Sequence, residues 1–312
     1  RLASDFYSGK WSSRGRDLQL RVRRNQVTTM THVLHSRPVT EAIAENLAHR
    51  IERLKILGIE PTLALVRVGA RPDDLSYERT AVRRAESLGI TTRVFDLPET
   101  ASQEKLLLQL RRINGDSKIH GCLLFRPLPE NMEEKLVSDE LAMAKDIDGI
   151  STSSLGAVFT DAVEGYAPCT AEACVKMLDF YNIPVEGKHV VVVGRSLVVG
   201  KPVAMLLLRR NASVTICHSR TSDLAEITHT ADIVICATGR ARAYDARYFK
   251  PGQVVLDVGI NFDKNGKLCG DVDYDSVEPL VEAITPVPGG LGSVTTSVTM
   301  EHVVTAAEKT IR

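Results

Sequence analysis

The feature that most constrains the fold is a run of four valines, Val190 to Val193, that leads into a glycine-rich turn. An uninterrupted apolar run of this kind is typical of a strand buried on both faces in a parallel sheet. The chain turns at Gly194 and enters an apolar helix with Pro202 in its first turn, where a backbone donor would be unpaired anyway. Glycine allows close backbone approach, and helix amides attract phosphate. The stretch therefore favours a nucleotide site, with an ordinary tight turn as the alternative.

Composition excludes several classes of protein. The chain has 312 residues, enough for two domains with a core each. Its 39 basic and 39 acidic residues balance, so neither a nucleic acid nor a membrane surface is expected as a partner. No apolar run approaches the roughly 18 residues of a membrane span. The six cysteines form no C-x-x-C pair, so we expect reduced thiols and no metal site.

The first 29 residues differ from the rest, because they are rich in arginine and serine and show no clear periodicity. We predict a disordered extension for residues 1–29, with an organellar transit peptide as the alternative.

The remaining chain alternates predicted helices and strands. Helical spacing or strand character is found at 40–57, 61–68, 75–88, 92–95, 102–114 and 121–125, and a second series runs from 171 to 310. This order predicts α/β units with parallel sheets. In the second series, polar or glycine-rich turns follow the predicted strands, at 218–221, 238–239 and 259–261. Ligands of open α/β sheets bind at such strand ends.

A series of motifs then gives a more specific indication. They are Ser76-Tyr77, Pro-Leu-Pro at 127–129, Lys-Asp-Ile-Asp-Gly at 145–149, Pro-Cys-Thr at 168–170, Val-Gly-Arg-Ser-Leu-Val-Val-Gly-Lys-Pro at 193–202, Cys-His-Ser-Arg-Thr at 217–221, Asp-Val-Gly-Ile-Asn at 257–261 and Pro-Val-Pro-Gly-Gly-Leu-Gly at 286–292. Together they closely resemble the methylenetetrahydrofolate dehydrogenase/methenyltetrahydrofolate cyclohydrolase family. The resemblance covers residue 30 to the end.

The resemblance implies a two-domain α/β fold. A folate-side catalytic domain would comprise residues 30–150 and be completed by 288–312, with the C-terminal helix returning to it. A Rossmann-type NADP-binding domain would comprise residues 151–287, and folate and nicotinamide would meet between the two domains. The resemblance also implies a homodimer, and we expect a cytoplasmic location.

The resemblance assigns the cofactor residues. They are Gly194, Arg195, Ser196 and Gly200 in the phosphate turn, Ser219 beside it, and Thr238, Gly239 and Ile260 around the nicotinamide. Arg195 and Ser219 match positions that hold the additional phosphate of NADP, which a guanidinium and a hydroxyl suit chemically. NADP is therefore favoured over NAD, while a solvated Arg195 is the alternative interpretation.

On the folate side, the resemblance assigns Tyr77 and Asp148 as candidate catalytic and substrate-binding residues. Tyr77 would stack on the tetrahydrofolate derivative, and the Asp148 carboxylate would accept hydrogen bonds from the pterin. A surface acidic turn is the alternative for Asp148. Pro288, Gly289 and Gly290 would border the same pocket.

Two positions depart from the family pattern. The family lysine four residues after the tyrosine is Ala81 here, and the glutamine before the Pro-Leu-Pro turn is Phe125. Arg84, one further turn along the predicted helix, and Arg126 are possible substitutes. Arginine, however, does not readily shuttle a proton.

These departures affect the two family reactions differently. Hydride transfer mainly requires two rings held face to face, whereas hydrolysis requires a positioned water and proton transfer. We predict an NADP-dependent methylenetetrahydrofolate dehydrogenase with weakened or absent cyclohydrolase activity. The alternatives are a related two-domain dehydrogenase of the shikimate or amino-acid type and a non-catalytic folate or nucleotide sensor.

Overall fold

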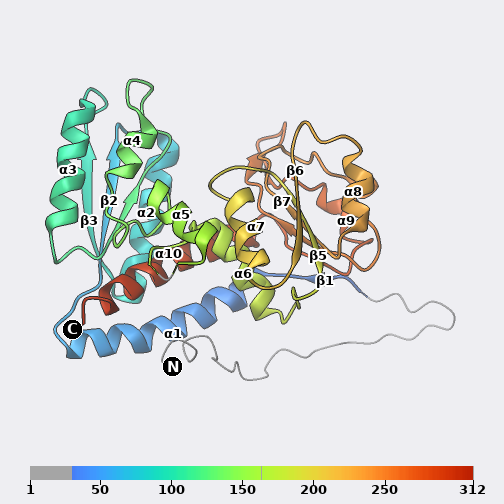
Figure 1. Cartoon of the computed structure of the whole chain (residues 1–312), viewed down its shortest axis with the longest axis horizontal. Coiled ribbons are helices and arrows are strands. Elements are labelled where there is room, and N and C mark those ends of the chain that lie inside the picture. Colours follow the sequence, from blue (N-terminus) through green and yellow to red (C-terminus); the bar gives the residue numbers. More distant parts are fainter. Residues whose placement is uncertain (1–29, 163, 312) are drawn as a thin grey trace. The chain divides into compact units, whose positions relative to one another are not determined.

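The computed structural model describes residues 30–162 and 164–311 (Figure 1). The predicted extension at 1–29 lies outside the described residues. Residues from Thr31 onwards form one compact unit, which is described here by itself.

The valine run lies inside a six-stranded sheet in which every strand is parallel to its neighbours. The strand order is β1 (His32–Val33), β11 (Ala283–Ile284), β8 (Val254–Asp257), β7 (Ile233–Cys236), β5 (His189–Val193) and β6 (Ser213–Cys217). Val190 to Val193 are at most 1% exposed, as a strand covered on both faces requires. Because β6 lies on one side of β5 and β7 on the other, the strand order reverses at β5.

A smaller parallel sheet carries the first part of the chain. Its order is β3 (Thr91–Leu97), β2 (Thr62–Val68) and β4 (Gly121–Leu124). Two helices of this region are α2 (Pro72–Leu88) and α3 (Gln103–Gly115). The apolar side chains of α3 pack on one face of this sheet, where Leu106, Leu110 and Ala64 belong to one buried cluster.

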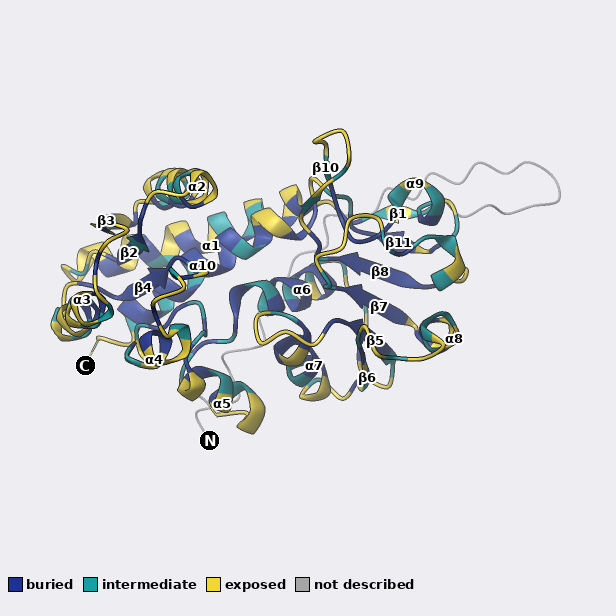
Figure 2. Ribbon diagram, turned by 90° about the horizontal axis from the view of Figure 1, so that it is seen from above, coloured by how far each residue is buried: buried dark blue, intermediate teal, exposed yellow. Residues whose placement is uncertain are grey.

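Three helices contribute to a core that also includes residues of both sheets: α1 (Ser36–Ile56), α6 (Cys169–Phe180) and α10 (Leu291–Glu308). Figure 2 shows α10 as largely buried. It contacts α1, α6 and α2, as well as β2 and β4. The C-terminal helix therefore returns to the part of the chain that precedes residue 150, as the sequence predicted.

The remaining elements are short. They are α4 (Glu134–Asp139), α5 (Thr152–Thr160), α7 (Gly200–Leu208), α8 (Leu224–Thr230), a 3-10 turn at Ala246–Tyr248, α9 (Tyr274–Val277), and the antiparallel pair β9 (Asn261–Phe262) and β10 (Leu268–Cys269). Among the described residues, no helix combines the length and apolar character needed to cross a bilayer.

One boundary differs from the sequence prediction in a way that matters for the site. Helix α2 begins at Pro72, not near residue 75, so Asp73 and Asp74 belong to its first turn. Proline at the first position and acidic residues in the first turn both stabilise a helix start. The loop predicted there is therefore shorter, and two carboxylates are fixed on a helix.

Candidate active site

Tyr77 and Asp148 line the same cavity, which has a volume of about 260 Å³. Tyr77 lies on α2, and Asp148 lies in the loop between α4 and α5. The rest of the lining is Asp73, Asp74, Leu123, Leu124, Phe125 and Arg126. The two residues proposed for the folate side, 71 positions apart in the sequence, are thus brought together by the fold.

Hydrogen bonds of the neighbouring residues Lys145 and Asp146 fix the loop at 145–149 that carries Asp148. Lys145 Nζ donates to the carbonyls of Ile113 and Asp116, each at 2.6 Å. The buried Asp146 carboxylate accepts the backbone N–H groups of Ile150 and Ser151, at 3.0 and 2.8 Å. Lys145 and Asp146 therefore hold the loop in place, and Asp148 is the acidic residue of this loop that lines the cavity.

Gly149 ends this loop with a positive φ of 62°. A Cβ at this position would lie 2.5 Å from the carbonyl oxygen of Tyr166, which no side chain can accommodate. The backbone after Asp148 therefore requires glycine for both its conformation and its packing.

Arg126 is the basic residue nearest to Asp148 in the cavity. Its guanidinium lies 3.8 Å from the Asp148 carboxylate and 3.6 Å from that of Glu134. Burial raises the pKa of Asp148, and the charge of Arg126 opposes that rise. The Asp148 side chain is 25% exposed, so water and ligands can reach it.

Tyr77 stays neutral in this environment. Partial burial, and secondarily the charge of Asp148, raise the pKa of its hydroxyl above the ordinary value, although the residue as a whole is 38% exposed. Tyr77 can therefore donate a hydrogen bond and present its ring, but it cannot act as a base near neutral pH.

The two departures from the family pattern are buried apolar residues, of which Phe125 lines the cavity beside Tyr77. Ala81 is 1% exposed and Phe125 is 6% exposed, and both belong to one buried cluster. The Phe125 ring packs edge-on against Tyr77, with centroids 5.8 Å apart. Two buried apolar side chains thus stand where the family pattern has two polar groups.

Arg84 does not replace the missing lysine. Its guanidinium donates to the carbonyl of Thr40 at 3.2 Å and to the hydroxyl of Ser297 at 3.1 Å. It lines neither cavity described here. Helical spacing alone placed Arg84 on the same face as Tyr77. It could not show that the guanidinium is hydrogen-bonded to residues of α1 and α10.

A second cavity of about 320 Å³ shares Arg126 and Asp148 with the first. Its far wall includes Leu197 and Val198, which belong to the glycine-rich turn after β5. Ile150, Thr152 and Leu155 contribute from the segment between the sheets. The Asp148 carboxylate and the predicted phosphate turn therefore line the same second cavity.

The glycine-rich turn has the close packing that a phosphate site requires. A Cβ on Gly194, whose φ is 137°, would collide with the carbonyl of Ala237, and a Cβ on Gly200 would collide with that of Gly194. The Ser196 hydroxyl accepts the backbone N–H of Val199 at 3.1 Å and so shapes the turn before α7. Helix α7 then presents its N-terminal amides to this turn.

The other predicted cofactor residues follow strands of the same sheet. Ser219 comes after β6, Thr238 and Gly239 after β7, and Ile260 after β8. Since parallel neighbours end at the same edge of a sheet, all these residues share the edge where Gly194 and Arg195 lie. Arg195 and Ser219 are exposed, and within the described part of the chain the Arg195 guanidinium makes no ion pair.

Asp271 joins two of these loops, and sequence reasoning missed it. Its buried carboxylate accepts the backbone N–H groups of Thr238, Gly239 and Arg240 at 2.5 to 3.1 Å. It also accepts the side-chain amide of Asn261 at 2.9 Å. The loops after β7 and β8 are therefore held together by one carboxylate.

The glycine-rich loop at 286–292 lies near the same edge. Pro288, Gly289 and Gly290 line neither of the two cavities. The carbonyl of Gly289 accepts the backbone N–H and the hydroxyl of Ser36, at 2.8 and 2.9 Å. At Gly292, a Cβ would lie 3.5 Å from the side chain of Ile260, so the start of α10 adjoins a predicted cofactor residue.

Asp73 and Asp74 were also missed as residues of the cavity. Asp74 is buried and forms a two-pronged pair with Arg71 at 2.8 and 3.0 Å. The helix-start signal at Pro72 was present in the sequence and could have placed both carboxylates beside Tyr77. Within the described ranges, no cluster of histidine, cysteine and acidic residues could hold a metal ion.

Comparisons with known proteins agree with this geometry. A family model described as the tetrahydrofolate dehydrogenase/cyclohydrolase catalytic domain matches residues 34–148, and that family's NAD(P)-binding domain matches residues 168–311. The bifunctional protein FolD of Carboxydothermus hydrogenoformans is 50% identical over 281 residues, which is 89% of this chain and 98% of the relative.

Solved structures give the same result. The bifunctional FolD methylenetetrahydrofolate dehydrogenase/cyclohydrolase of Campylobacter jejuni has a TM-score of 0.88 at 35% identity, covering 89% of this chain and 99% of its own. The Trypanosoma brucei FolD enzyme, solved with NADP cofactor and an inhibitor, has a TM-score of 0.85 at 31% identity, with coverages of 90% and 99%.

Proposed function

Since this chain belongs to the tetrahydrofolate dehydrogenase/cyclohydrolase family, we propose that it oxidises methylenetetrahydrofolate to methenyltetrahydrofolate with NADP as the hydride acceptor. A C–H bond of the one-carbon unit breaks, and its hydride passes to the nicotinamide. The folate product is a cation. NADP, when bound, supplies the redox chemistry, and the protein supplies binding and orientation. Membership of this family disfavours the shikimate-type alternative.

The observation that carries the proposal is that the two cavities share Arg126 and Asp148. Both contain Asp148, one contains Tyr77, and the other reaches Leu197 and Val198 of the phosphate turn. A folate bound between Tyr77 and Asp148 therefore lies on the path to a nucleotide bound at Gly194. Hydride transfer needs this proximity of two rings more than it needs an acid or a base.

The residues at the phosphate turn fit NADP. Gly194 and Gly200 permit the tight turn that a phosphate site needs, because a Cβ at either position would collide with backbone. Arg195 is exposed and without an ion pair among the described residues, so its planar guanidinium is available for a phosphate. Ser219 follows the neighbouring strand and could donate its hydroxyl to the same group. The cofactor assignment includes Ser196, Thr238, Gly239 and Ile260.

Cyclohydrolase activity is proposed to be weak. Opening the methenyl cation requires a water molecule and proton transfer, yet the apolar Phe125 lines the cavity beside Tyr77, and Ala81 is buried. Arg126 contributes positive charge but no proton acceptor. The product cation should therefore leave the protein unhydrolysed.

The proposed domains are 30–150 completed by 288–312, and 151–287, in agreement with the contact of α10 with α1. We propose a homodimer in the cytoplasm, as the family resemblance implies. Six buried free cysteines suit a reducing compartment. Size measurement in solution tests the dimer.

The test is a turnover assay with methylenetetrahydrofolate, run in parallel with NADP and NAD. We expect reduced nicotinamide to form faster with NADP, together with methenyltetrahydrofolate that persists instead of becoming formyltetrahydrofolate. NADPH binding without turnover would favour the non-catalytic sensor. Rapid formation of the formyl product would refute the loss of hydrolysis.

A further inference from the structure

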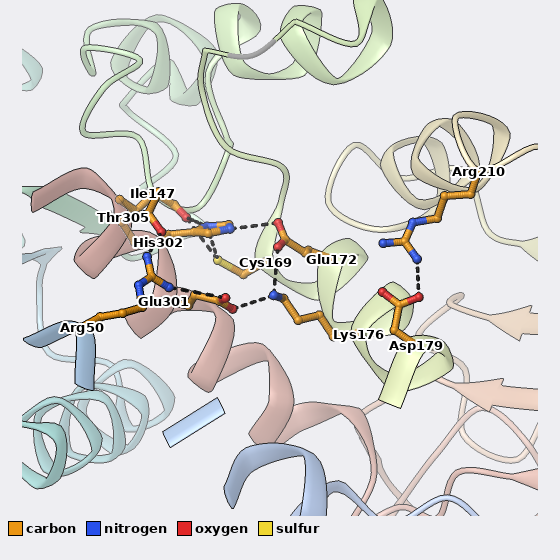
Figure 3. Close-up of polar contacts among 10 residues, drawn as sticks. All are labelled: Arg50, Ile147, Cys169, Glu172, Lys176, Asp179, Arg210, Glu301, His302 and Thr305. Carbon is orange, nitrogen blue, oxygen red and sulfur yellow. Dashed lines mark hydrogen bonds and ion pairs between the residues drawn. The ribbon is translucent and has the colours of Figure 1, made fainter. Parts of the chain in front are cut away.

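A buried polar cluster lies behind the cavity, and none of its side chains lines the cavities. His302, on α10, is 5% exposed. Its Nδ1 lies 2.7 Å from the carbonyl oxygen of Ile147, and its Nε2 lies 2.9 Å from Oε2 of Glu172 on α6 (Figure 3). Both ring nitrogens therefore have an acceptor.

Such an arrangement favours the imidazolium, because only the charged ring has two N–H donors. Burial alone would lower the pKa of His302, but the charge and hydrogen bond of Glu172 and the carbonyl of Ile147 together raise it. Burial would raise the pKa of Glu172, but His302 and the nearby basic groups hold it at about 2. The pair thus consists of a buried imidazolium and a partly buried carboxylate.

The pair is continued by further charges that join three helices (Figure 3). Lys176 Nζ lies 3.8 Å from Glu172 and 2.8 Å from Glu301. Arg50, on α1, lies 3.7 Å from Glu301 and 2.7 Å from Glu308. Helices α1, α6 and α10 are therefore fixed relative to one another around His302.

The carbonyl that His302 holds belongs to the peptide directly before Asp148. The thiol of Cys169 donates to the same oxygen at 3.2 Å, so the carbonyl accepts two buried donors. Gly149 fixes the other side of Asp148 by its positive φ and tight packing. The orientation of the Ile147–Asp148 peptide therefore depends on a donor supplied by α10.

We propose that His302 is a positioning residue for Asp148. Through its Nδ1–H it holds the Ile147 carbonyl, and this fixes the direction in which the Asp148 carboxylate enters the cavity. The inference rests on the proposed function, in which Asp148 receives the pterin. A rigidly held carboxylate binds a planar donor pair better than a mobile one, because less freedom is lost on binding.

Two substitutions separate this role from a merely structural one. Asparagine places its amide nitrogen near the position of Nδ1, so His302→Asn can keep the donor to Ile147 and lose the contact with Glu172. Glutamine reaches the position of Nε2, so His302→Gln can keep the contact with Glu172 and lose the donor to Ile147. Both variants remove the charge and keep a polar amide.

A third variant covers the case in which His302→Gln does not fold. Glu172→Gln keeps the size of the side chain and lets a neutral histidine retain Nδ1–H, with the introduced side-chain amide donating to Nε2. Tyr166→Phe is the matched control, because the Tyr166 ring lies 4.9 Å from that of His302 while its buried hydroxyl has no partner among the described residues.

The experiment measures KM for methylenetetrahydrofolate, KM for NADP, kcat and the thermal midpoint of each variant, and tetrahydrofolate affinity by calorimetry. Loss of one hydrogen bond corresponds to roughly tenfold in affinity. We expect His302→Gln to raise the folate KM about five- to tenfold, with an unchanged KM for NADP. His302→Asn, Glu172→Gln and Tyr166→Phe should stay within about twofold of the wild type.

Equal folate KM values for the His302→Asn and His302→Gln variants would overturn the inference. A folate KM that rises as much in Glu172→Gln as in His302→Gln would overturn it too. If His302→Gln fails to fold, a raised folate KM in Glu172→Gln overturns it and a normal one supports it. A wild-type protein without turnover refutes the proposed function instead. The positioning role is then decided by tetrahydrofolate affinity alone, with the same expected order of variants.

Discussion

The ring of Phe125 packs edge-on against the ring of Tyr77, with the two planes at 73°. Phe125 thus closes one side of the cavity with carbon atoms, and the buried methyl group of Ala81 lies one helical turn after Tyr77. Phe125 and Ala81 belong to one buried cluster, in which a large side chain directly after β4 accompanies a small one on α2. Reversal of one substitution alone should therefore fit poorly.

Restoring both polar groups should create hydrolysis. We expect Ala81→Lys combined with Phe125→Gln to raise cyclohydrolase activity by about 10² or more, the usual contribution of a positioned acid or base. Ala81→Lys alone should lower stability, because it places an ammonium in a buried apolar site. Formation of formyltetrahydrofolate and thermal midpoints are the measurements. An inactive but folded double variant would show that more than these two positions is missing.

Cofactor choice should depend on Arg195. Replacement by alanine removes the guanidinium proposed to bind the additional phosphate, and a charged hydrogen bond of this type is worth about 1.5–3 kcal/mol. We expect KM for NADP to rise about 10- to 100-fold, with KM for NAD nearly unchanged. Ser219→Ala should give the same pattern more weakly. An equal loss with both cofactors would contradict the assignment.

The pH profile should reveal the pairing of Arg126 with Asp148. The guanidinium opposes the rise that burial causes in the pKa of Asp148. Arg126→Leu removes that opposition, so the carboxyl will protonate at a higher pH and folate binding will be lost earlier as the pH falls. We expect the acid limb of kcat/KM for the folate to move upward in pH. Asp148→Asn should raise the folate KM at every pH and abolish the limb.

The His302–Glu172 pair should make stability depend on pH in two directions. Glu172 has a lowered pKa of about 2 against an ordinary 4.5, so its contribution is complete above pH 4.5 and is lost as pH falls towards 2. The pKa of His302 is raised above 6.5, so its contribution is complete below that value and lost as pH rises through the raised pKa. The pair should stabilise most between pH 4.5 and 6.5.

Urea unfolding of the wild type and of Glu172→Gln, from below pH 4.5 to above pH 6.5, measures the effect. We expect a loss of about 1.5–3 kcal/mol at the maximum, the usual contribution of a hydrogen bond between charged groups, because the neutral histidine keeps only an uncharged partner. Glu41→Gln is the control, because the Arg37–Glu41 pair has side chains that are 86% and 63% exposed and should contribute little. A flat difference between wild type and Glu172→Gln would refute the pairing.

Much of the fold was predictable because its signals are local. The valine run predicted β5, and the polar residues after each later strand predicted the edge at which Arg195, Ser219 and Thr238 gather. Strands β1 and β11, each of two residues, carry no periodicity and could not be found. The positions of Tyr77 and Asp148 followed from motifs, whereas their shared cavity depends on packing.

Contacts between distant segments were beyond sequence reasoning. His302 and Glu172 are 130 residues apart, and neither belongs to a motif with a metal or nucleophile spacing. For Arg84, helical spacing correctly predicted the helix face that it shares with Tyr77. It could not predict the hydrogen bonds of Arg84 to residues of α1 and α10. The role of a polar side chain depends on which groups it already hydrogen-bonds or pairs with, and only the folded chain determines those partners.

Strand β1 pairs with β11, and α10 packs on α1, so elements from the beginning and the end of the described chain complete each other. A cut between residues 148 and 168, where the two matched family segments separate, would leave each fragment without an element that the other carries. The first fragment would keep α1 without its partner helix, and the second would lose an edge strand. Separately produced halves should aggregate when alone and recover activity only when refolded together.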